Sequence, residues 1–369
     1  MAIRDHFKAV YYDPSLEGLP WGRREIERFL PFNPRPKGRE ELKEEILSLS
    51  PDPIGDGKRV LYLAPHRGSL LKPCPGTKGY SCCGYWVGNV AVGCPMDCTY
   101  CILQGYLNEP IITLQLPWGK FFDELRAKAR GPRPLRVGTG ELSDSLVLEP
   151  FLGFVAEAVE FFARFEGAVL ELKTKTDRVE GLLPLEHASR TVVAWSLNPP
   201  KVVEEQERGT AALMARLKAA RLCQQRGYPV AFHFDPLLHY SGWESDYQML
   251  IEELFRWIDP RGVIWISLGT LRFPKGLEKI IRQRFPRSWI LSGEFLPGED
   301  GKLRYFKPLR IEIYKKVLSW LREYPLKGFI YLCMEREDVW EAVFGFRPGG
   351  TRGLKERLES HTEEFLRKW

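Results

Sequence analysis

Residues 86–101 read WVGNVAVGCPMDCTYC, an apolar run followed at once by a loop that holds three cysteines. The run from 86 to 92 is rich in valine and includes a tryptophan, which favours a β-strand. Cys94, Cys98 and Cys101 then fall within eight residues. In parallel α/β barrels the functional groups lie in loops that follow the C-terminal ends of the strands. The stretch therefore predicts a strand with a functional loop directly after it.

The chemistry of the three cysteines narrows what this loop can hold. Three thiolates so close together can ligate three irons of a 4Fe-4S cluster, because soft sulfur is the donor that such clusters use. The absent fourth thiolate would leave one iron open to a substrate or cofactor. Zinc is the alternative, but structural zinc sites have four protein ligands. Disulfides are rare in cytosolic proteins. We predict that Cys94, Cys98 and Cys101 bind a 4Fe-4S cluster.

Strand and helix patterns alternate along the chain from residue 86 onward. Five more β-rich runs follow the first, at residues 135–138, 168–174, 191–197, 229–235 and 263–269. Amphipathic helical patterns separate the six runs, at 121–130, 151–165, 178–183, 211–227 and 247–258. Such alternation predicts an α/β fold with a parallel sheet, either open and doubly wound or curled into a partial TIM-type barrel.

Composition divides the chain into three parts. Residues 1–85 are rich in proline, glycine and charge, and we expect an N-terminal extension that ends in a cysteine-rich segment. Residues 86–270 hold the strand and helix alternation, and residues 271–369 are expected to form a basic segment that packs on it. Between 272 and 316, twelve Lys or Arg stand against five Asp or Glu, with aromatic residues among them. This composition favours a nucleic-acid face, although a solvated helix surface would have the same counts.

Overall composition indicates a folded protein. The 369 residues are 44% apolar and carry a net charge of +6, which permits an anionic partner without requiring one. The first residues are charged and lack an apolar run, and nowhere do 18 uncharged apolar residues follow one another. We expect a cytoplasmic protein that does not span a membrane.

Longer motifs connect the cysteine loop to a known family. The spacing of the cysteines, with aromatic Tyr100 before the last one, resembles the radical S-adenosylmethionine (SAM) superfamily. Other segments are similar to spore photoproduct lyase and related DNA repair photolyase-like proteins. They are VYYDPSLEGLPWG (10–22), GCPMDCTYCILQ (93–104), ELSDSLVLE (141–149), TKTDRVEGLL (174–183), SLNP (196–199), ERGT (207–210), GYPVAFHFDPLLHYSGWESDY (227–247) and RFPKGLEKIIRQRFP (272–286).

This resemblance implies a fold and a chemistry. The fold is a partial (β/α)6 TIM-type barrel with the N-terminal extension and the C-terminal basic α/β segment. SAM would bind the open iron through its amino and carboxylate groups. One electron, from a donor such as flavodoxin or ferredoxin, would cleave SAM to a deoxyadenosyl radical. That radical would abstract a hydrogen atom from a substrate, which the family resemblance suggests is DNA or a nucleotide.

Glycines and a carboxylate follow the second expected strand. Gly138 and Gly140 permit a close backbone approach, and Glu141 could accept a hydrogen bond from the SAM ammonium, as the superfamily's glycine-rich acidic motif does. The same Gly-Thr-Gly pattern also occurs in ordinary turns. Its position at a strand end favours the SAM site.

Other candidate SAM contacts lie in the cluster loop or at strand ends. Ser143 and Lys175 match residues that contact SAM in the lyases, and Lys175 could pair with the SAM carboxylate. An exposed lysine at a strand end is the alternative. Ser196 and Asn198 suit hydroxyl or carboxylate recognition at the end of the fourth strand. Tyr100 matches an aromatic residue of the lyases, but it could instead pack over the cluster.

Two polar residues end the fifth strand. Alternation along PVAFHFD places His233 and Asp235 on the same face, which we expect to lie at the mouth of the barrel. The lyases have apolar residues there. We interpret His233 and Asp235 as substrate contacts, with a satisfied interior polar pair as the alternative.

Cys74, Cys82 and Cys83 precede the first strand at a place where the spore enzymes have no cysteine. They could hold a second iron-sulfur cluster or another metal, form a redox pair, or supply a hydrogen donor. Simple burial is the alternative, since cysteine is often buried. Cys223 and Cys333 lie in apolar patterns and are expected in the core.

Two departures from the lyases concern hydrogen return. In the lyases a cysteine in a Cys-Thr-Ser-Asp segment returns a hydrogen atom to the product, and here Glu141 begins the corresponding segment. The tyrosine that follows the third cluster cysteine in the lyases is Ile102 here. We therefore expect a radical SAM enzyme of the lyase-like family that does not perform standard spore photoproduct repair.

Two other functions remain open at this stage. One is a radical SAM enzyme that acts on a peptide or small metabolite. The other is a non-catalytic zinc-dependent nucleic-acid binder, against which the Glu141 and Lys175 pattern argues.

Overall fold

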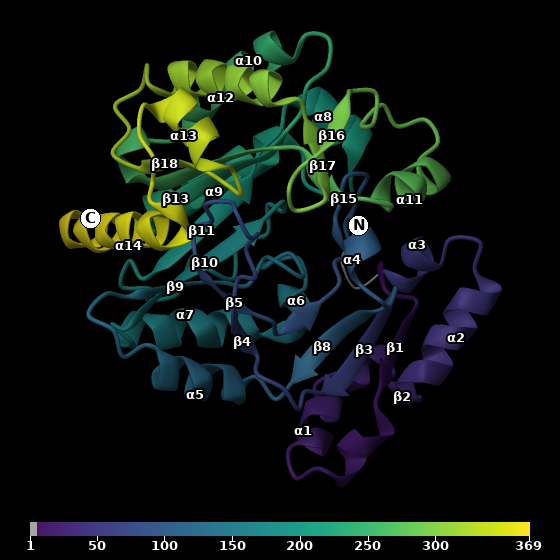
Figure 1. The fold of residues 1–369 in the computed structure, drawn as a ribbon. Coiled ribbons are helices and arrows are strands. Elements are labelled where there is room, and N and C mark those ends of the chain that lie inside the picture. Colours follow the sequence, from purple (N-terminus) through teal and green to yellow (C-terminus); the bar gives the residue numbers. More distant parts are fainter. Residues whose placement is uncertain (1–5) are drawn as a thin grey trace.

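A curled eight-stranded sheet dominates the computed structural model, which describes residues 6–369 (Figure 1). The strands lie in the order β18-β14-β13-β11-β10-β9-β5-β4, and all neighbours pair in parallel except β4 with β5. Their bounds are β4 (Leu71–Pro73), β5 (Trp86–Gly88), β9 (Leu135–Gly138), β10 (Ala168–Thr174), β11 (Thr191–Ser196), β13 (Val230–Leu237), β14 (Val263–Thr270) and β18 (Phe329–Leu332).

The six expected strands are therefore adjacent and in chain order. This order is that of a partial barrel. In a doubly wound sheet the order of the strands across the sheet would reverse at one point. The C-terminal strand β18 adds a seventh parallel strand beside β14. The sheet thus draws strands from all three parts of the chain, and the proposed division at 85 and 270 stays a prediction.

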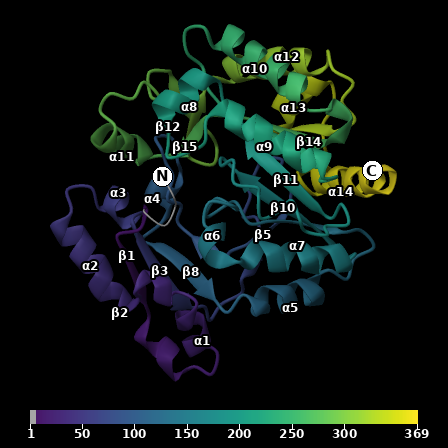
Figure 2. The same cartoon turned by 180° about the vertical axis from the view of Figure 1, so that it is seen from behind.

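Helices cover the outside of the curled sheet (Figures 1 and 2). They include α5 (Gly119–Lys128), α7 (Phe154–Arg164), α9 (Leu213–Gln225), α10 (Trp243–Trp257), α12 (Lys307–Leu321) and α14 (Gly350–Lys368). Because helices cover one face and the barrel interior covers the other, the central strands are buried on both faces. Every residue of β11 and β14 is buried.

Helix α7 shows why these helices form where they do. Phe154, Val155, Ala158, Val159 and Phe162 recur at helical spacing and are all buried. Phe154 stacks on Phe122 of α5, with ring centroids 5.9 Å apart. The single helix expected over 151–165 is divided, because Gly153 adopts a left-handed φ of 62° between α6 (Glu149–Leu152) and α7.

Two other expectations about elements are wrong. The strand expected over 86–92 is divided, because only β5 joins the barrel while β6 (Ala91–Val92) pairs with β8 (Ile112–Leu116) in another sheet. The helix expected over 178–183 is a turn. Val179 and Leu182 are buried there and the turn is closed by the Leu182 amide donating to the Val179 carbonyl at 2.8 Å.

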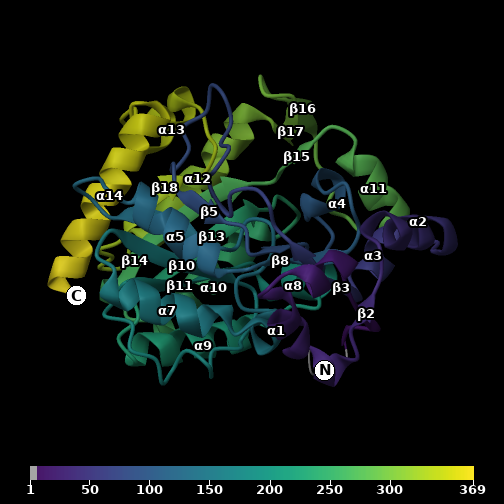
Figure 3. The ribbon, with the colours of Figure 1, turned by 90° about the horizontal axis from the view of Figure 1, so that it is seen from below.

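The N-terminal extension supplies three strands to a second, five-stranded sheet with the order β2-β1-β3-β8-β6, in which β8 and β6 come from the part of the chain after residue 85. Its other strands are β1 (Ala9–Tyr12), β2 (Arg35–Pro36) and β3 (Val60–Pro65), and α1 (Gly22–Glu27), α2 (Arg39–Leu49) and α3 (Pro53–Gly57) accompany them. Figure 3 shows this part beside the barrel, next to α4 (Leu103–Tyr106) and α11 (Leu277–Arg284). The remaining elements are β7 (Asp97–Cys98), β12 (Glu207–Arg208), β15 (Arg272–Pro274), β16 (Phe295–Pro297), β17 (Lys302–Tyr305), α8 (Pro200–Gln206) and α13 (Glu337–Phe344).

Much of the basic segment is structural. Arg304 pairs with Asp300 at 2.8 Å, and Arg310 pairs with Glu335 at 2.9 Å, with both arginines buried.

Within residues 6–369 no helix is long and apolar enough to cross a membrane.

Candidate functional site

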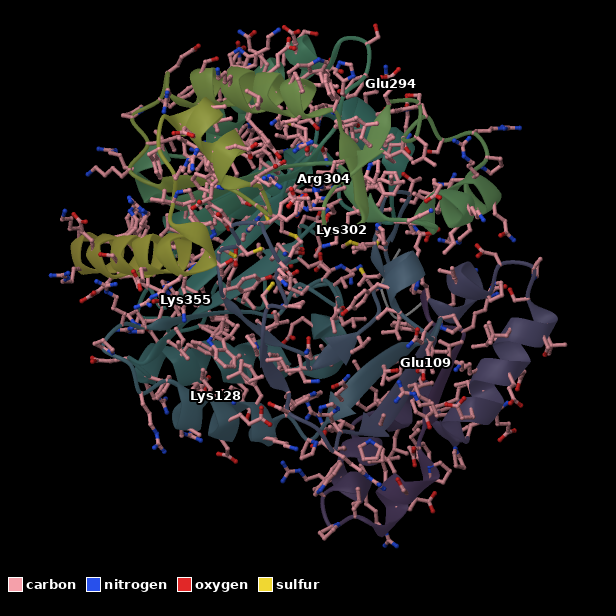
Figure 4. The ribbon with its side chains drawn as sticks, in the orientation of Figure 1. Glu109, Lys128, Glu294, Lys302, Arg304 and Lys355 are labelled. Atoms are coloured by element: carbon pink, nitrogen blue, oxygen red, sulfur yellow. The ribbon has the colours of Figure 1, made fainter. Side chains whose placement is uncertain are left out.

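A cavity of about 310 Å³ lies at the C-terminal ends of the barrel strands. Figure 4 shows Lys302, one of its wall residues, near the centre of the molecule. Most of the sequence-predicted site residues meet in its wall. The predicted residues found there are Cys94, Cys98, Tyr100, Cys101, Gly140, Glu141, Ser143, Lys175, Ser196, His233 and Asp235.

The three cysteines of the loop share this one cavity. Burial raises the pKa of Cys94 to about 12 and holds that of Cys98 well above its usual range. Both thiols therefore keep their protons until a metal displaces them. Three sulfur donors facing one cavity fit a 4Fe-4S cluster with one iron open. Among residues 6–369, no three His, Cys, Asp or Glu side chains already stand in a geometry that holds a single metal ion.

Neighbouring backbone and side chains fix the cluster loop. Cys98 in β7 pairs with Glu207 in β12, and the Thr99 amide donates to the Gln206 carbonyl at 2.9 Å. The Gln104 amide group donates to the carbonyls of Cys98 and Thr99 at 3.2 and 3.0 Å. These contacts fix the backbone of the loop that carries the three cysteines.

Glu207 is the centre of a buried polar network behind the cavity. Arg216 donates to its carboxylate at 2.6 Å, Asn198 donates at 2.9 Å, and the Tyr100 hydroxyl also donates to it. Burial is the largest single effect and would raise the pKa of Glu207, but the charges of Arg216 and Lys175 and the hydrogen bonds from Tyr100 and Asn198 together lower it. Asn198 is fully buried and also accepts from Tyr247 at 2.7 Å, so it supports the wall without lining it.

One buried hydroxyl in the cavity wall has no partner. Ser143 is 7% exposed, and its Oγ forms no hydrogen bond with any described residue. Close by, the Lys175 amide donates to Asp144 at 2.7 Å, and the Lys175 ammonium lies 5.9 Å from the centre of the Tyr100 ring. Within residues 6–369 that ammonium forms no ion pair. An unsatisfied hydroxyl and an unpaired cation suit a polar, carboxylate-bearing ligand.

Glu141 already has a cationic partner, Lys173 at the end of β10. Burial would raise the pKa of Glu141, but Lys173 outweighs it and the carboxylate is ionised. Gly140 lies against this strand, and a Cβ there would stand 2.9 Å from the Lys173 Cβ. Gly138 does not line the cavity; a Cβ there would stand 2.7 Å from the Tyr85 ring.

The two residues that end the fifth strand are separately paired. His233 lies 2.7 Å from Glu171, and Arg272 holds Asp235 with two contacts of 3.0 and 2.9 Å. Burial would raise the pKa of Glu171, but His233 and then the charges of Arg136 and Lys173 hold it at about 2. His233, Asp235 and Arg272 line the cavity, whereas Glu171 lies behind His233 and does not.

Cys74, Cys82 and Cys83 lie outside the cavity wall, and all three are free thiols whose pKa burial raises. The Ser81 amide donates to the Glu335 carbonyl at 2.8 Å, which brings this segment beside the one after β18. Cys223 is fully buried as expected, but Cys333 accepts from Arg272 at 3.3 Å near the cavity.

Several charged residues of the site were missed, among them Asp144, Arg272 and Lys302 in the cavity wall. The others are Lys173, Glu171, Glu207 and Arg216. The sequence shows that these side chains are charged, but their partners lie on other segments of the chain. The spacing of Lys173 and Lys175 on one strand face was the only available signal.

Comparisons with known proteins identify the family of this chain. The family model described as spore photoproduct lyase matches residues 82–303. A spore photoproduct lyase of a Geobacillus species is 29% identical over 204 residues, 54% of this chain and 60% of that protein. The Bacillus subtilis enzyme is 29% identical over 203 residues, 54% of this chain and 59% of its own. The matched region thus spans about three fifths of each relative.

Solved structures extend the likeness in fold. A cysteine-to-serine variant of spore photoproduct lyase is 24% identical, with a TM-score of 0.78 over 88% of this chain and 98% of that one. A spore photoproduct lyase complexed with dinucleoside spore photoproduct is 23% identical, with the same TM-score and coverage. These structures have the partial barrel described above. By its family model and its fold, the chain belongs to the spore photoproduct lyase family, within the radical SAM superfamily.

Proposed function

We propose that this protein is a radical SAM enzyme that holds a 4Fe-4S cluster on Cys94, Cys98 and Cys101 and acts on a nucleic acid or nucleotide. The observation that carries the proposal is one cavity that contains the three thiols, the unsatisfied Ser143 hydroxyl and the unpaired Lys175 ammonium. When bound, the cluster and SAM supply a one-electron cleavage to a carbon radical that abstracts hydrogen.

The chain's own residues position the ligand in this scheme. Lys175 offers a cation to the SAM carboxylate, and Ser143 offers its hydroxyl. Tyr100 packs beside the cluster loop with its hydroxyl held by Glu207. His233 and Asp235 present polar edges to the substrate, each with an orientation fixed by its partner.

The substrate class rests on family membership and on the protein surface. One solved relative is complexed with dinucleoside spore photoproduct. In this chain α11 and the residues around it present Lys275, Lys279, Arg282 and Arg287 to solvent. Exposed basic side chains beside the cluster loop suit phosphate contacts.

The hydrogen-return step is proposed to differ from that of the lyases. Glu141 stands where they have a donor thiol, and Lys173 holds its carboxylate ionised. An ionised carboxylate has no hydrogen atom to return. Given dinucleoside spore photoproduct, SAM and dithionite, the reconstituted protein should form no thymine dinucleotide. Efficient reversal to thymines would refute this part of the proposal.

The first experiment is low-temperature electron paramagnetic resonance of anaerobically reconstituted, dithionite-reduced protein, with and without SAM. We expect a reduced-cluster signal that SAM shifts and that Cys98→Ala abolishes. Bound zinc together with the absence of an iron signal would refute the proposed function and would indicate a structural zinc protein.

Further assays test the number of clusters, the substrate class and the electron donor. Replacing Cys74, Cys82 and Cys83 together by alanine should leave the iron content unchanged if a single cluster is present, and would lower the iron content if a second cluster exists.

Duplex binding that weakens steeply with salt would support a nucleic-acid substrate. Salt-independent turnover of a peptide or small metabolite would oppose it. Reduction by flavodoxin or ferredoxin in place of dithionite would identify the electron donor.

A further inference from the structure

The cluster loop has a second side, away from the large cavity. A smaller cavity of about 140 Å³ lies there, and Cys94, Cys101 and Lys58 are in its wall. Of these two cavities, Cys98 lines the large one and Lys58 lines the small one. Cys94 and Cys101 therefore line both cavities. Lys58 lies on the side of the small cavity and is not part of the wall of the proposed SAM cavity.

Lys58 is directed at the loop itself. It follows α3 in the N-terminal extension, and its side chain is 11% exposed. Its Nζ donates to the Met96 carbonyl and lies 2.9 Å from an Asp97 carboxylate oxygen. Both partners lie between Cys94 and Cys98. Lys58 shares the wall of the small cavity with Cys94 and Cys101.

A second cation holds the carboxylate of Asp97. Arg284 of α11 contacts its two oxygens at 3.1 and 3.2 Å and pairs with Asp52 at 2.8 Å. The Asp97 charge is thus shared between Arg284 and Lys58. Two cations, Lys58 and Arg284, thus meet two carboxylates, Asp97 and Asp52, and Lys58 is the cation that lines the small cavity together with the cluster cysteines.

We propose that Lys58 is a positioning residue that holds the cluster loop from behind and raises the reduction potential of the cluster. The proposal rests on the 4Fe-4S cluster proposed above. Reduction adds a negative charge to the cluster, and a buried cation close to its sulfurs stabilises that charge more than it stabilises the oxidised form. Burial matters, because water and salt would screen the same charge at the surface.

The test is a redox titration of the reconstituted protein, followed by the cluster's electron paramagnetic resonance signal without SAM. In Lys58→Met the ratio of reduced to oxidised cluster at the wild-type midpoint should fall about tenfold, which equals a shift of about 59 mV for one electron. Lys58→Arg keeps the charge and should restore most of the potential. Lys279→Met removes an exposed lysine of the neighbouring helix α11 and serves as the matched control, with no shift.

A second variant keeps the proposal testable if Lys58→Met loses its cluster. Asp97→Asn removes a negative charge from the same place and should shift the potential in the opposite direction, upward. Unchanged potentials in the charge variants that retain a cluster would overturn the role of Lys58. The absence of any cluster signal in the wild-type protein would instead overturn the proposed function. If Lys58 and Asp97 had a purely structural role, their variants would change the iron content alone. The reduction potential of the cluster would then not move in opposite directions in Lys58→Met and Asp97→Asn.

Discussion

At the scale of single residues, the site depends on buried charges that are paired and on one hydroxyl that is not. Glu171 is 6% exposed and touches His233 at 2.7 Å and the Trp265 indole nitrogen at 3.1 Å. Its pKa of about 2 lies below the ordinary value of 4.5. The ionised carboxylate thereby fixes the ring of His233 at the cavity.

This depressed pKa predicts how stability depends on pH. The contribution of Glu171 is complete above its unfolded pKa of 4.5 and is lost as pH falls from there toward 2. The shift corresponds to about 3 kcal/mol. In Glu171→Gln, urea unfolding between pH 5 and 2.5 should therefore show a shallower loss of stability than in the wild-type protein. Parallel pH profiles would contradict the assignment.

Ser143→Ala should separate ligand binding from folding. Because its buried Oγ has no partner, its removal should leave the ligand-free protein as stable as before or more stable by about 1 kcal/mol. SAM affinity of the cluster-loaded protein should fall severalfold by calorimetry.

The matched control for that prediction is Ser145→Ala. The Ser145 hydroxyl accepts from Thr139 at 2.8 Å and from the Lys173 amide at 3.0 Å, so its removal should destabilise the protein by about 1–3 kcal/mol. If both variants lost equal stability, Ser143 would have an internal partner.

At the scale of elements, the site is made where β9 and β10 end side by side. Gly140 allows the loop after β9 to lie against β10, since a Cβ would be 2.9 Å from the Lys173 Cβ and 3.0 Å from its carbonyl oxygen. The ion pair between Glu141 and Lys173 crosses the same contact. The geometry of the proposed SAM site therefore depends on this approach.

Gly140→Ala should push the two elements apart. We expect a stability loss of about 1–3 kcal/mol by urea unfolding and a weaker affinity for SAM. Gly119→Ala at the start of α5 is the control, because a Cβ there meets nothing within 4 Å. An equally small effect in both variants would show that the loop can move freely.

At the scale of the whole molecule, residues far apart in the sequence hold the cluster loop. Arg284 of the C-terminal segment contacts Asp52 of the N-terminal extension and both Asp97 and Gln104 of the loop. The extension and the basic segment thus brace a loop that belongs to the barrel (Figure 3).

Arg284→Met should loosen this brace without unfolding the barrel. The iron retained per chain after desalting of reconstituted protein should fall at least twofold, with an unchanged circular dichroism spectrum. Arg282→Met, an exposed neighbour on α11, should retain the wild-type iron content. Equal iron retention in the two variants would contradict the bracing role.

Local pattern was enough to predict much of this protein. The periodicity of apolar residues and the β-rich composition predicted the parallel strands, and the cysteine spacing predicted the loop. These features depend on residues that are close in the chain. The motifs predicted the family and the partial barrel, both confirmed. Most predicted site residues also meet in one cavity, since the strand ends of a parallel sheet share one edge.

Only the tertiary structure decided which charges meet. Nothing near Glu141 in the sequence identifies Lys173 as its partner, and nothing near Asn198 shows that Glu207 and Tyr247 occupy its polar atoms. The N-terminal sheet and the place of Lys58 behind the cluster loop were equally hidden. Ion pairs and buried networks are set by distance in space, whereas the sequence alone determines which chemical groups are available and the local shapes that carry them.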